Sequence, residues 1–154
     1  MLKLNQPAPE FKQPAYEAGK DFTEVSLSGQ KGKWVVLFFY PRDFTFVCPT
    51  EIRGFAKAEK AFADFERDLK EVKFPILADT AHTLARDYEV LNESDGTAER
   101  GTFIIDPEGN LRYIVVSDGN VGRSVEETLR VVKALQTGGL CPIDWEPGDA
   151  NLKA

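Results

Sequence analysis

The sequence predicts an α/β protein in which strands and helices alternate and the last two strands form a hairpin. Residues 34–40 are a continuous run of β-prone apolar side chains, which is typical of a strand buried on both faces. From about residue 49, apolar side chains recur at helical spacing. Two further β-prone runs, 101–105 and 111–116, flank a turn at 106–110, which predicts an antiparallel hairpin.

The chain before the first strong strand carries weaker signals. Residues 1–20 contain three prolines and no periodicity, so we expect an irregular lead-in that is anchored by Phe11. Residues 21–27 alternate weakly between polar and apolar side chains, and residues 28–32 have the composition of a turn. The strand at 34–40 follows directly.

A long helix is expected to continue to about residue 72, with Ile52, Phe55 and Phe62 on its apolar face. The charged residues on its other face are typical of a helix surface in contact with water. A short strand is expected at 74–79.

Two more helices are predicted in the second half of the chain. We expect a short one at 81–88, capped by Thr80. The last helix has a clearer signal, because Ser124 and Glu127 have the spacing of a capping box and Gly138 provides a stop after residue 136.

Composition limits the functions that this chain can have. A length of 154 residues with 42% hydrophobic side chains suits one domain, 1–154, with 137–154 as its C-terminal tail. The net charge of −6 and the lack of a basic cluster argue against nucleic acid or an anionic membrane as a partner. We see no leader and no run of bilayer length, so we expect a cytoplasmic protein. Two cysteines and one histidine are too few for a disulfide scaffold or a structural zinc site.

Cys48 carries the strongest chemical signal. It is expected in the first turn of the long helix, at the carboxyl end of the strand at 34–40, where open α/β sheets bind their ligands. Free backbone N–H groups and the helix dipole favour a thiolate there, so we expect a lowered pKa. Thr45, three residues earlier, can place its hydroxyl at the same point. The alternative is a cysteine that serves as a small, inert buried side chain.

The residues around Cys48 decide between these alternatives. They closely resemble the peroxidatic motif of the peroxiredoxins, and more narrowly the typical two-cysteine branch that includes bacterial alkyl hydroperoxide reductase C. The matching residues are Tyr40, Pro41, Phe44, Thr45, Phe46, Val47, Cys48, Pro49, Thr50 and Glu51. The resemblance covers nearly the whole chain, and the predicted order of elements is compatible with a thioredoxin-like fold, a central mixed β-sheet flanked by helices.

The resemblance implies roles for further residues. Arg123 would be the guanidinium that holds the thiolate and the peroxide, although an arginine before a helix can also be an ordinary surface residue. Glu51 either orients that arginine or is an ordinary acidic residue of a first helical turn. Pro41 would shield the thiolate from water or simply end the strand, and Tyr40 would belong to the core or to the rim of the pocket.

Cys141 lies in an irregular tail segment, 140–145, that resembles the resolving-cysteine segment of the family. The alternative is a chance cysteine in a flexible tail. His82 is the only histidine, and nothing in the sequence relates it to Cys48. We therefore expect a structural or exposed histidine and no cysteine–histidine hydrolase.

The resemblance implies a thiol peroxidase with an antioxidant role. Cys48 would attack hydrogen peroxide or an organic hydroperoxide and become a sulfenic acid, and Cys141 of a partner subunit would condense with it to a disulfide. Thioredoxin or a dedicated flavoprotein reductase would restore both thiols, with no bound cofactor, and the protein would be a homodimer or a ring of dimers. Two alternatives stay open: a disulfide oxidoreductase of the same fold, which usually needs a Cys-x-x-Cys pair, and a catalytically silent holdase or assembly protein.

One stretch departs from the family. A strand and a helix are expected between the long helix and the segment at 73–79, but here residues 65–69 lead almost directly into that segment. We expect a sheet that is one strand short. The strand at 74–78 would then move beside the strand at 34–40 through a right-handed crossover.

Overall fold

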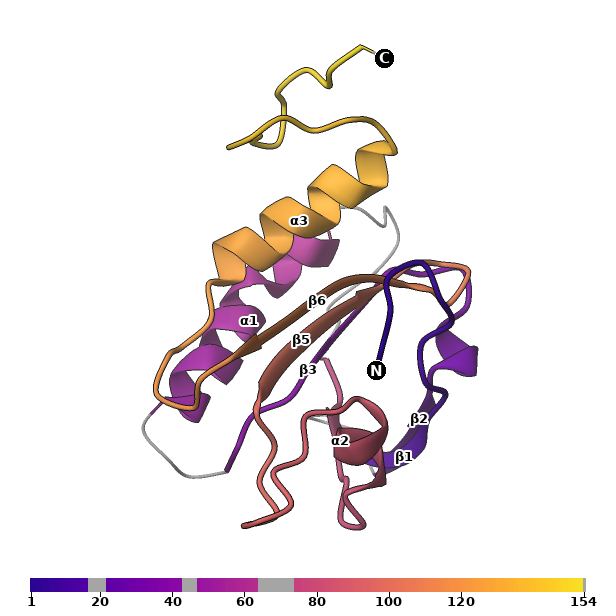
Figure 1. Ribbon diagram of the computed structural model, residues 1–154, viewed down its shortest axis with the longest axis vertical. Helices are drawn as coiled ribbons and strands as arrows, with labels where there is room; N and C mark the ends of the chain where they lie inside the picture. The colour runs from indigo at the N-terminus through magenta and orange to yellow at the C-terminus, as the bar shows by residue number, and fades with distance from the viewer. Residues whose placement is uncertain (17–21, 43–46, 64–73, 154) are drawn as a thin grey trace. The chain divides into compact units, whose positions relative to one another are not determined.

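The computed structural model describes residues 1–16, 22–42, 47–63 and 74–153. The chain divides into two compact units, Met1–Arg123 and Ser124–Ala154. Among the described residues, the larger unit contains the strands, two α-helices and a 3-10 helix (Ser28–Gln30), and the smaller unit contains the last helix and the segment that follows it (Figure 1). No helix in the described ranges is long and apolar enough to cross a bilayer.

The main sheet of the larger unit is built from β3 (Val35–Phe38), β5 (Arg100–Ile105) and β6 (Leu111–Ser117), in that spatial order and all antiparallel. Every residue of β5 is buried, because β5 is the central strand. β3 is only half-buried at each position, so the expectation of a strand buried on both faces is wrong. The reason is its place at the edge: within the described ranges, β3 pairs with another strand only on its β5 side.

The predicted hairpin is confirmed, and its turn is held by one carboxylate. Asp106 Oδ1 accepts hydrogen bonds from the backbone N–H groups of Glu108, at 3.1 Å, and Asn110, at 2.8 Å. Gly109 has φ +92°, a conformation that glycine adopts without the steric cost of a Cβ.

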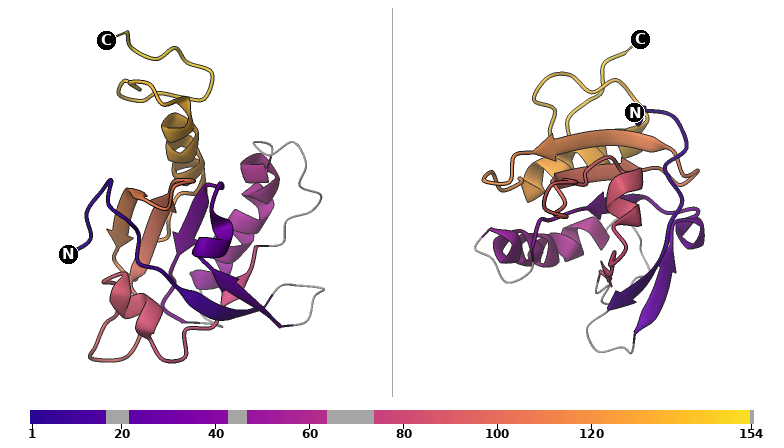
Figure 2. Two further views of the ribbon diagram at one scale, coloured as in Figure 1. Left: turned by 90° about the vertical axis from the view of Figure 1, so that its right-hand side faces the viewer. Right: turned by 60° about the horizontal axis from the view of Figure 1, so that its bottom comes forward.

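Helices cover both faces of this sheet, as predicted (Figure 2). α1 (Cys48–Ala63) packs on one face, where the ring of Phe55 stacks on Phe38 with centroids 4.4 Å apart. On the opposite face the ring of Phe39 contacts Tyr88, which follows α2 (Thr83–Asp87), at 5.6 Å between centroids. Successive residues of an extended chain point to opposite faces, so Phe38 and Phe39 divide the two layers.

The second layer contains the aromatic core of the larger unit. The Tyr88 ring lies against Phe103 of β5, at 4.9 Å between centroids, and against Phe11, at 6.5 Å. The Tyr88 hydroxyl donates to the carbonyl oxygen of Pro9 at 2.9 Å, so its polar end is satisfied inside the core. The expectation that Phe11 anchors the N-terminal segment is confirmed, because its side chain is buried in this cluster.

A second antiparallel sheet contains β1 (Lys12–Tyr16), β2 (Thr23–Ser26) and β4 (Ile76–Leu77), in the order β2-β1-β4. The expectation of an irregular lead-in is therefore wrong for β1. Pro14 has no backbone N–H to donate, but the strand does not need one there. Its carbonyl oxygen accepts a hydrogen bond from Ala78 N, just after β4, at 2.9 Å.

The position of β4 contradicts the expected crossover. β4 pairs with β1 and not with β3, so the strand does not move into the place beside 34–40. All strand pairs in the described part of the chain are antiparallel, and the parallel pairing of the expected mixed sheet is not found among them. β4 takes the edge of β1 that is not paired with β2.

The observed first residues of α1 and α2 can be compared with the helix starts that the sequence predicts. α1 begins at Cys48, as predicted, while its expected end near residue 72 lies outside the described residues. At α2 the cap residue is His82, whose side chain makes no capping hydrogen bond, so the expected Thr80 cap is wrong. The Asp79 carboxylate accepts instead from the backbone N–H groups of Leu84, at 3.1 Å, and Ala85, at 2.8 Å.

The smaller unit consists of α3 (Val125–Thr137) and an irregular tail. Ser124 caps α3 as predicted, since its hydroxyl oxygen accepts from Glu127 N at 3.0 Å. The Glu127 carboxylate binds Arg130, at 2.6 and 2.8 Å, so the second half of the capping box is replaced by an ion pair. Gly138 ends the helix with φ +66°, also as predicted.

Candidate active site

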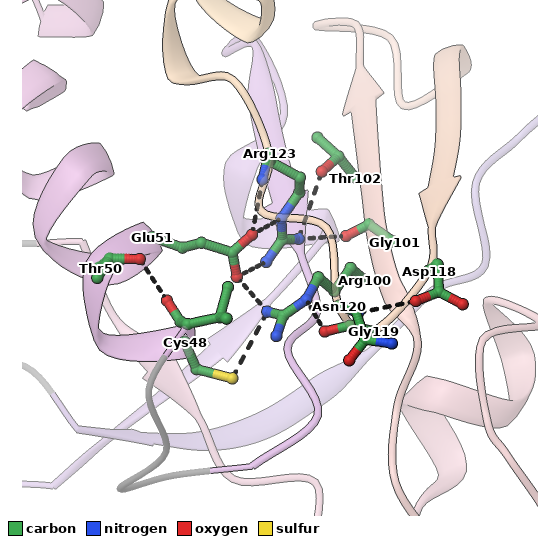
Figure 3. A network of polar contacts seen from close by, with 11 residues as sticks. Cys48, Thr50, Glu51, Arg100, Gly101, Thr102, Asp118, Gly119, Asn120 and Arg123 are labelled. Atoms are coloured by element: carbon green, nitrogen blue, oxygen red, sulfur yellow. Dashed lines mark hydrogen bonds and ion pairs between the residues drawn. The ribbon is translucent and has the colours of Figure 1, made fainter.

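Cys48 lies where the sequence places it, at the first residue of α1, and its side chain is buried with 1% exposure. Its sulfur points to the guanidinium of Arg100, with 3.5 Å between Sγ and Nη1 (Figure 3). A buried thiol next to a cation is the environment in which a cysteine acts as a thiolate.

Arg100 is the site residue that the sequence analysis missed. It opens β5, and three contacts fix its side chain: Nε donates to the Gly119 carbonyl oxygen at 3.0 Å, and Nη1 donates to Cys48 and, at 2.5 Å, to Glu51 Oε2. The signal for it was an arginine at the start of a strand that is otherwise buried, since a buried cation requires an anionic partner. Its partners lie 49 and 52 residues away in the sequence, so no local pattern reveals them.

Arg123 is held by Glu51 in a two-pronged ion pair. Nε donates to Oε1 and Nη2 to Oε2, both at 2.9 Å, and the backbone N–H of Arg123 donates to Oε1 at 3.0 Å. Nη1 donates to the Gly101 carbonyl oxygen at 2.9 Å, and the guanidinium carbon lies 5.1 Å from the centre of the Phe38 ring. In Figure 3 the two arginines lie on either side of the Glu51 carboxylate, and it is Arg100 that reaches the sulfur.

Glu51 connects the two arginines. It lies in the first turn of α1, so the two interpretations of this residue are compatible: it is a first-turn acid and it also orients arginine side chains. Burial alone would raise its pKa, but hydrogen bonds from Arg123 and the charges of Arg123 and Arg100 outweigh burial and lower the pKa. Glu51 is therefore ionised at neutral pH.

The cluster has an unbalanced charge. The side chains of Glu51, Arg100 and Arg123 are each only 3% exposed, and together they carry one negative and two positive charges. A net positive charge in a buried place is costly unless an anion neutralises it. A thiolate at Cys48, in contact with Arg100, is an anion in the right place. The same cations can stabilise negative charge that develops on an oxygen bound next to the sulfur.

The remaining predicted site residues, and the single histidine, are placed as follows. Tyr40 and Pro41 follow β3 and are half-buried. Thr45 lies outside the described residues. Cys141 belongs to the smaller unit, where it is a half-buried free thiol. His82 directly precedes α2, on the face of the sheet opposite to α1.

No cluster in the described ranges could bind a metal ion, since none brings together three or more histidine, cysteine or carboxylate side chains in a suitable arrangement. The candidate site is thus a thiol with two guanidinium groups and one carboxylate.

Comparisons with known proteins identify the family of this chain. The model of the AhpC/TSA family matches residues 4–70 and 58–114. A putative peroxiredoxin in the rubredoxin operon of Clostridium pasteurianum is 48% identical to this chain, and the match covers 97% of this chain and 98% of the relative. A thioredoxin peroxidase of Trypanosoma brucei rhodesiense is 44% identical, with 99% and 90% covered. The chain belongs to the AhpC/TSA family of peroxiredoxins.

Solved structures confirm the fold of this peroxiredoxin. A reduced 2-Cys peroxiredoxin of Plasmodium vivax superposes with a TM-score of 0.88 at 31% identity, and the match covers 97% of this chain and 92% of the other. AhpC of Enterococcus faecalis gives a TM-score of 0.78 at 35% identity, with 92% and 100% covered. The thioredoxin-like fold is thereby confirmed, and so is the enzyme class: the protein is a thiol peroxidase and an oxidoreductase.

The alignments also locate the departure from the family. The alignment with the Clostridium relative is 174 positions long against a chain of 154 residues, so at least 20 positions of the relative have no counterpart here. The two ranges matched by the family model overlap at residues 58–70. The peroxiredoxin therefore lacks an internal stretch near the end of α1, as the sequence predicts.

Proposed function

We propose that this peroxiredoxin reduces hydrogen peroxide and organic hydroperoxides through Cys48. The observation that carries the proposal is the contact of 3.5 Å between Cys48 Sγ and Arg100 Nη1 inside a buried cluster with a net positive charge. The thiolate attacks the terminal peroxide oxygen and the O–O bond breaks. Sulfur loses two electrons and becomes a sulfenic acid, while the released alkoxide or hydroxide takes up a proton.

The site residues have different roles in this proposal. Arg100 contacts the reacting sulfur and stabilises the charge on the leaving oxygen. Arg123 and Glu51 are positioning residues, because their contacts hold Arg100 and each other. In this proposal the Thr45 hydroxyl orients the peroxide. Pro41 shields the thiolate from water, and Tyr40 lies at the rim of the pocket.

Cys141 is the resolving cysteine in this proposal. Its thiol, from a partner subunit, condenses with the Cys48 sulfenic acid to a disulfide and releases water. The protein works as a homodimer or a ring of dimers in the cytoplasm, with an antioxidant role, and thioredoxin or a flavoprotein reductase restores the thiols. Two names support this assignment: the Trypanosoma relative is called a thioredoxin peroxidase, and the Plasmodium structure is of a 2-Cys peroxiredoxin.

The proposal is tested by treating the reduced protein with one equivalent of hydrogen peroxide and mapping the product. We expect a covalent dimer on a non-reducing gel and a peptide that joins Cys48 to Cys141 by mass spectrometry. Cys48→Ser and Cys141→Ser should each abolish that dimer. An oxidised protein that stays monomeric, with the disulfide inside one chain, would refute the intersubunit step.

A further inference from the structure

The sulfur of Cys141 is surrounded by oxygen atoms of the smaller unit. Thr137 Oγ1 lies at 3.6 Å, Asn151 Oδ1 at 3.7 Å, the Ala134 carbonyl oxygen at 3.8 Å and the Gly139 carbonyl oxygen at 4.0 Å. Three of these oxygens belong to the last turn of α3 or to the residues just after it. The fourth comes from Asn151, ten residues further along the chain.

Asn151 ties the tail back onto the end of α3. Its Nδ2 donates to Thr137 Oγ1 at 2.9 Å, while its Oδ1 accepts from the Cys141 thiol. The next residue, Leu152, donates its backbone N–H to the Leu140 carbonyl oxygen at 2.8 Å. Asn151 thus links the helix end and the cysteine through both polar atoms of its side chain.

The fit at this place depends on Gly139. A Cβ added to Gly139 would overlap the amide end of the Asn151 side chain. The backbone of Gly139 does not have a positive φ, so alanine is compatible with its conformation. The missing side chain at residue 139 therefore serves to admit Asn151.

We propose that Asn151 is a latch, a positioning residue that holds Cys141 against the C-terminal end of α3 and limits the rate at which Cys141 resolves the oxidised Cys48. The inference rests on the proposed function of Cys141. A disulfide forms only when the thiol sulfur can approach the sulfenic sulfur along an open path, so Cys141 must leave its oxygen partners first. The latch opens before the chemical step.

The gated reaction is the condensation of one thiol with one sulfenic acid. A sulfur–sulfur bond forms, the S–O bond of Cys48 breaks, and the thiol proton leaves with the hydroxyl group as water. The latch takes no part in this exchange. It changes only the fraction of time in which the Cys141 thiol is free to attack the Cys48 sulfenic acid.

Two substitutions open the latch by independent means. Asn151→Ala removes the side chain, and Gly139→Ala displaces it without changing Asn151. The loss of one or two hydrogen bonds should increase the open fraction about two- to tenfold. Lys153→Ala is the matched control, because Lys153 is exposed and lies in the same tail.

The first measurement is the rate at which a maleimide modifies Cys141 in reduced protein carrying Cys48→Ser. We expect about a two- to tenfold increase in both latch variants and no change in the control. This measurement does not depend on peroxidase activity. Equal modification rates in the Cys48→Ser parent, both latch variants and the control would show that there is no latch.

The second measurement follows peroxide oxidation by stopped flow with Cys48 present. Sulfenic acid formation should keep its rate, while disulfide formation should become about two- to tenfold faster in Asn151→Ala and Gly139→Ala. Disulfide formation that is unchanged or slower in both variants would overturn the proposal even if maleimide reacts faster. If wild-type protein forms no Cys48–Cys141 disulfide at all, the proposed function fails, and the maleimide rates still test the latch.

Discussion

At the scale of single residues, the chemistry of this peroxiredoxin depends on how charge is balanced around Cys48. Glu51 neutralises one of two buried arginines and leaves the other charge for the sulfur. The helix start supplies Cys48, and the cation that contacts it comes from β5. Removing the charge of Arg100 should therefore affect mainly the reactivity of Cys48, whereas removing the charge of Glu51 should affect mainly the stability of the protein.

Arg100→Met should slow the reaction of Cys48 with hydrogen peroxide by about 10²- to 10³-fold, because the leaving oxygen loses its cationic partner. Alkylation of Cys48 by iodoacetamide should also reach half of its maximal rate at a higher pH, because the thiolate loses its neighbouring charge. Arg86→Met, which breaks an exposed ion pair with Glu93, is the control. A peroxide rate for Arg100→Met within threefold of wild type would contradict the role of Arg100.

Glu51→Gln should destabilise the protein at neutral pH by about 3 kcal/mol, because two buried guanidinium groups lose their counter-charge. The pKa of Glu51 is lowered in the folded protein, so its stabilising effect is present above the ordinary carboxyl pKa. That effect is lost as the pH falls through the lowered value.

The check is urea unfolding of wild type and Glu51→Gln between pH 7 and pH 3. The difference in unfolding free energy should shrink on acidification, since protonation makes Glu51 resemble the neutral variant. Glu93→Gln should stay close to wild type across the series, because its ion pair is on the surface. A gap between wild type and Glu51→Gln that widens at low pH would contradict the assigned charge state.

At the scale of elements, the sequence predicts best where the signal is local. The hairpin turn, the start of α1 and the Ser124 cap each depend on residues within four positions of one another, and all three are confirmed. The sequence does not predict β1, because Pro14 disfavours a strand in the local pattern and the strand is fixed by pairing with β2 and β4, which lie later in the chain.

The wrong position of β4 and the missed Arg100 have the same physical cause. Strand partners depend on which edge is open in the folded sheet, and buried ion pairs depend on which elements meet. β4 joins β1, about 60 residues earlier in the chain, and Arg100 meets Glu51 across 49 residues. Contacts between residues so far apart in the sequence cannot be predicted from the local pattern of residues.

The cap of α2 gives a direct test at this scale. Asp79→Ala should reduce stability by about 1–2 kcal/mol, because two backbone N–H groups at the helix start lose their acceptor. Thr80→Ala should have little effect, since Thr80 is exposed and does not cap the helix. Urea unfolding of both variants measures the two losses of stability. A larger loss of stability for Thr80→Ala than for Asp79→Ala would contradict the role of Asp79 and support the cap that the sequence predicts.

At the scale of the whole molecule, the charged cluster is formed in this chain although the chain lacks at least 20 positions of its Clostridium relative. The cluster is built from the start of α1, from β5 and from the segment after β6. The missing stretch lies near residues 58–70, after the last cluster residue that α1 supplies. We therefore expect an active peroxidase and not a silent relative of one.

The most direct test of the central claim is a single turnover with hydrogen peroxide in the absence of any reductant. Cys141→Ser should consume one equivalent of peroxide per chain and form a sulfenic acid at Cys48, detected by dimedone labelling and mass spectrometry. Cys48→Ser should consume none. A Cys48→Ser protein that still consumes one equivalent, or a Cys141→Ser protein that consumes none, would contradict the assignment of Cys48 as the residue that attacks peroxide.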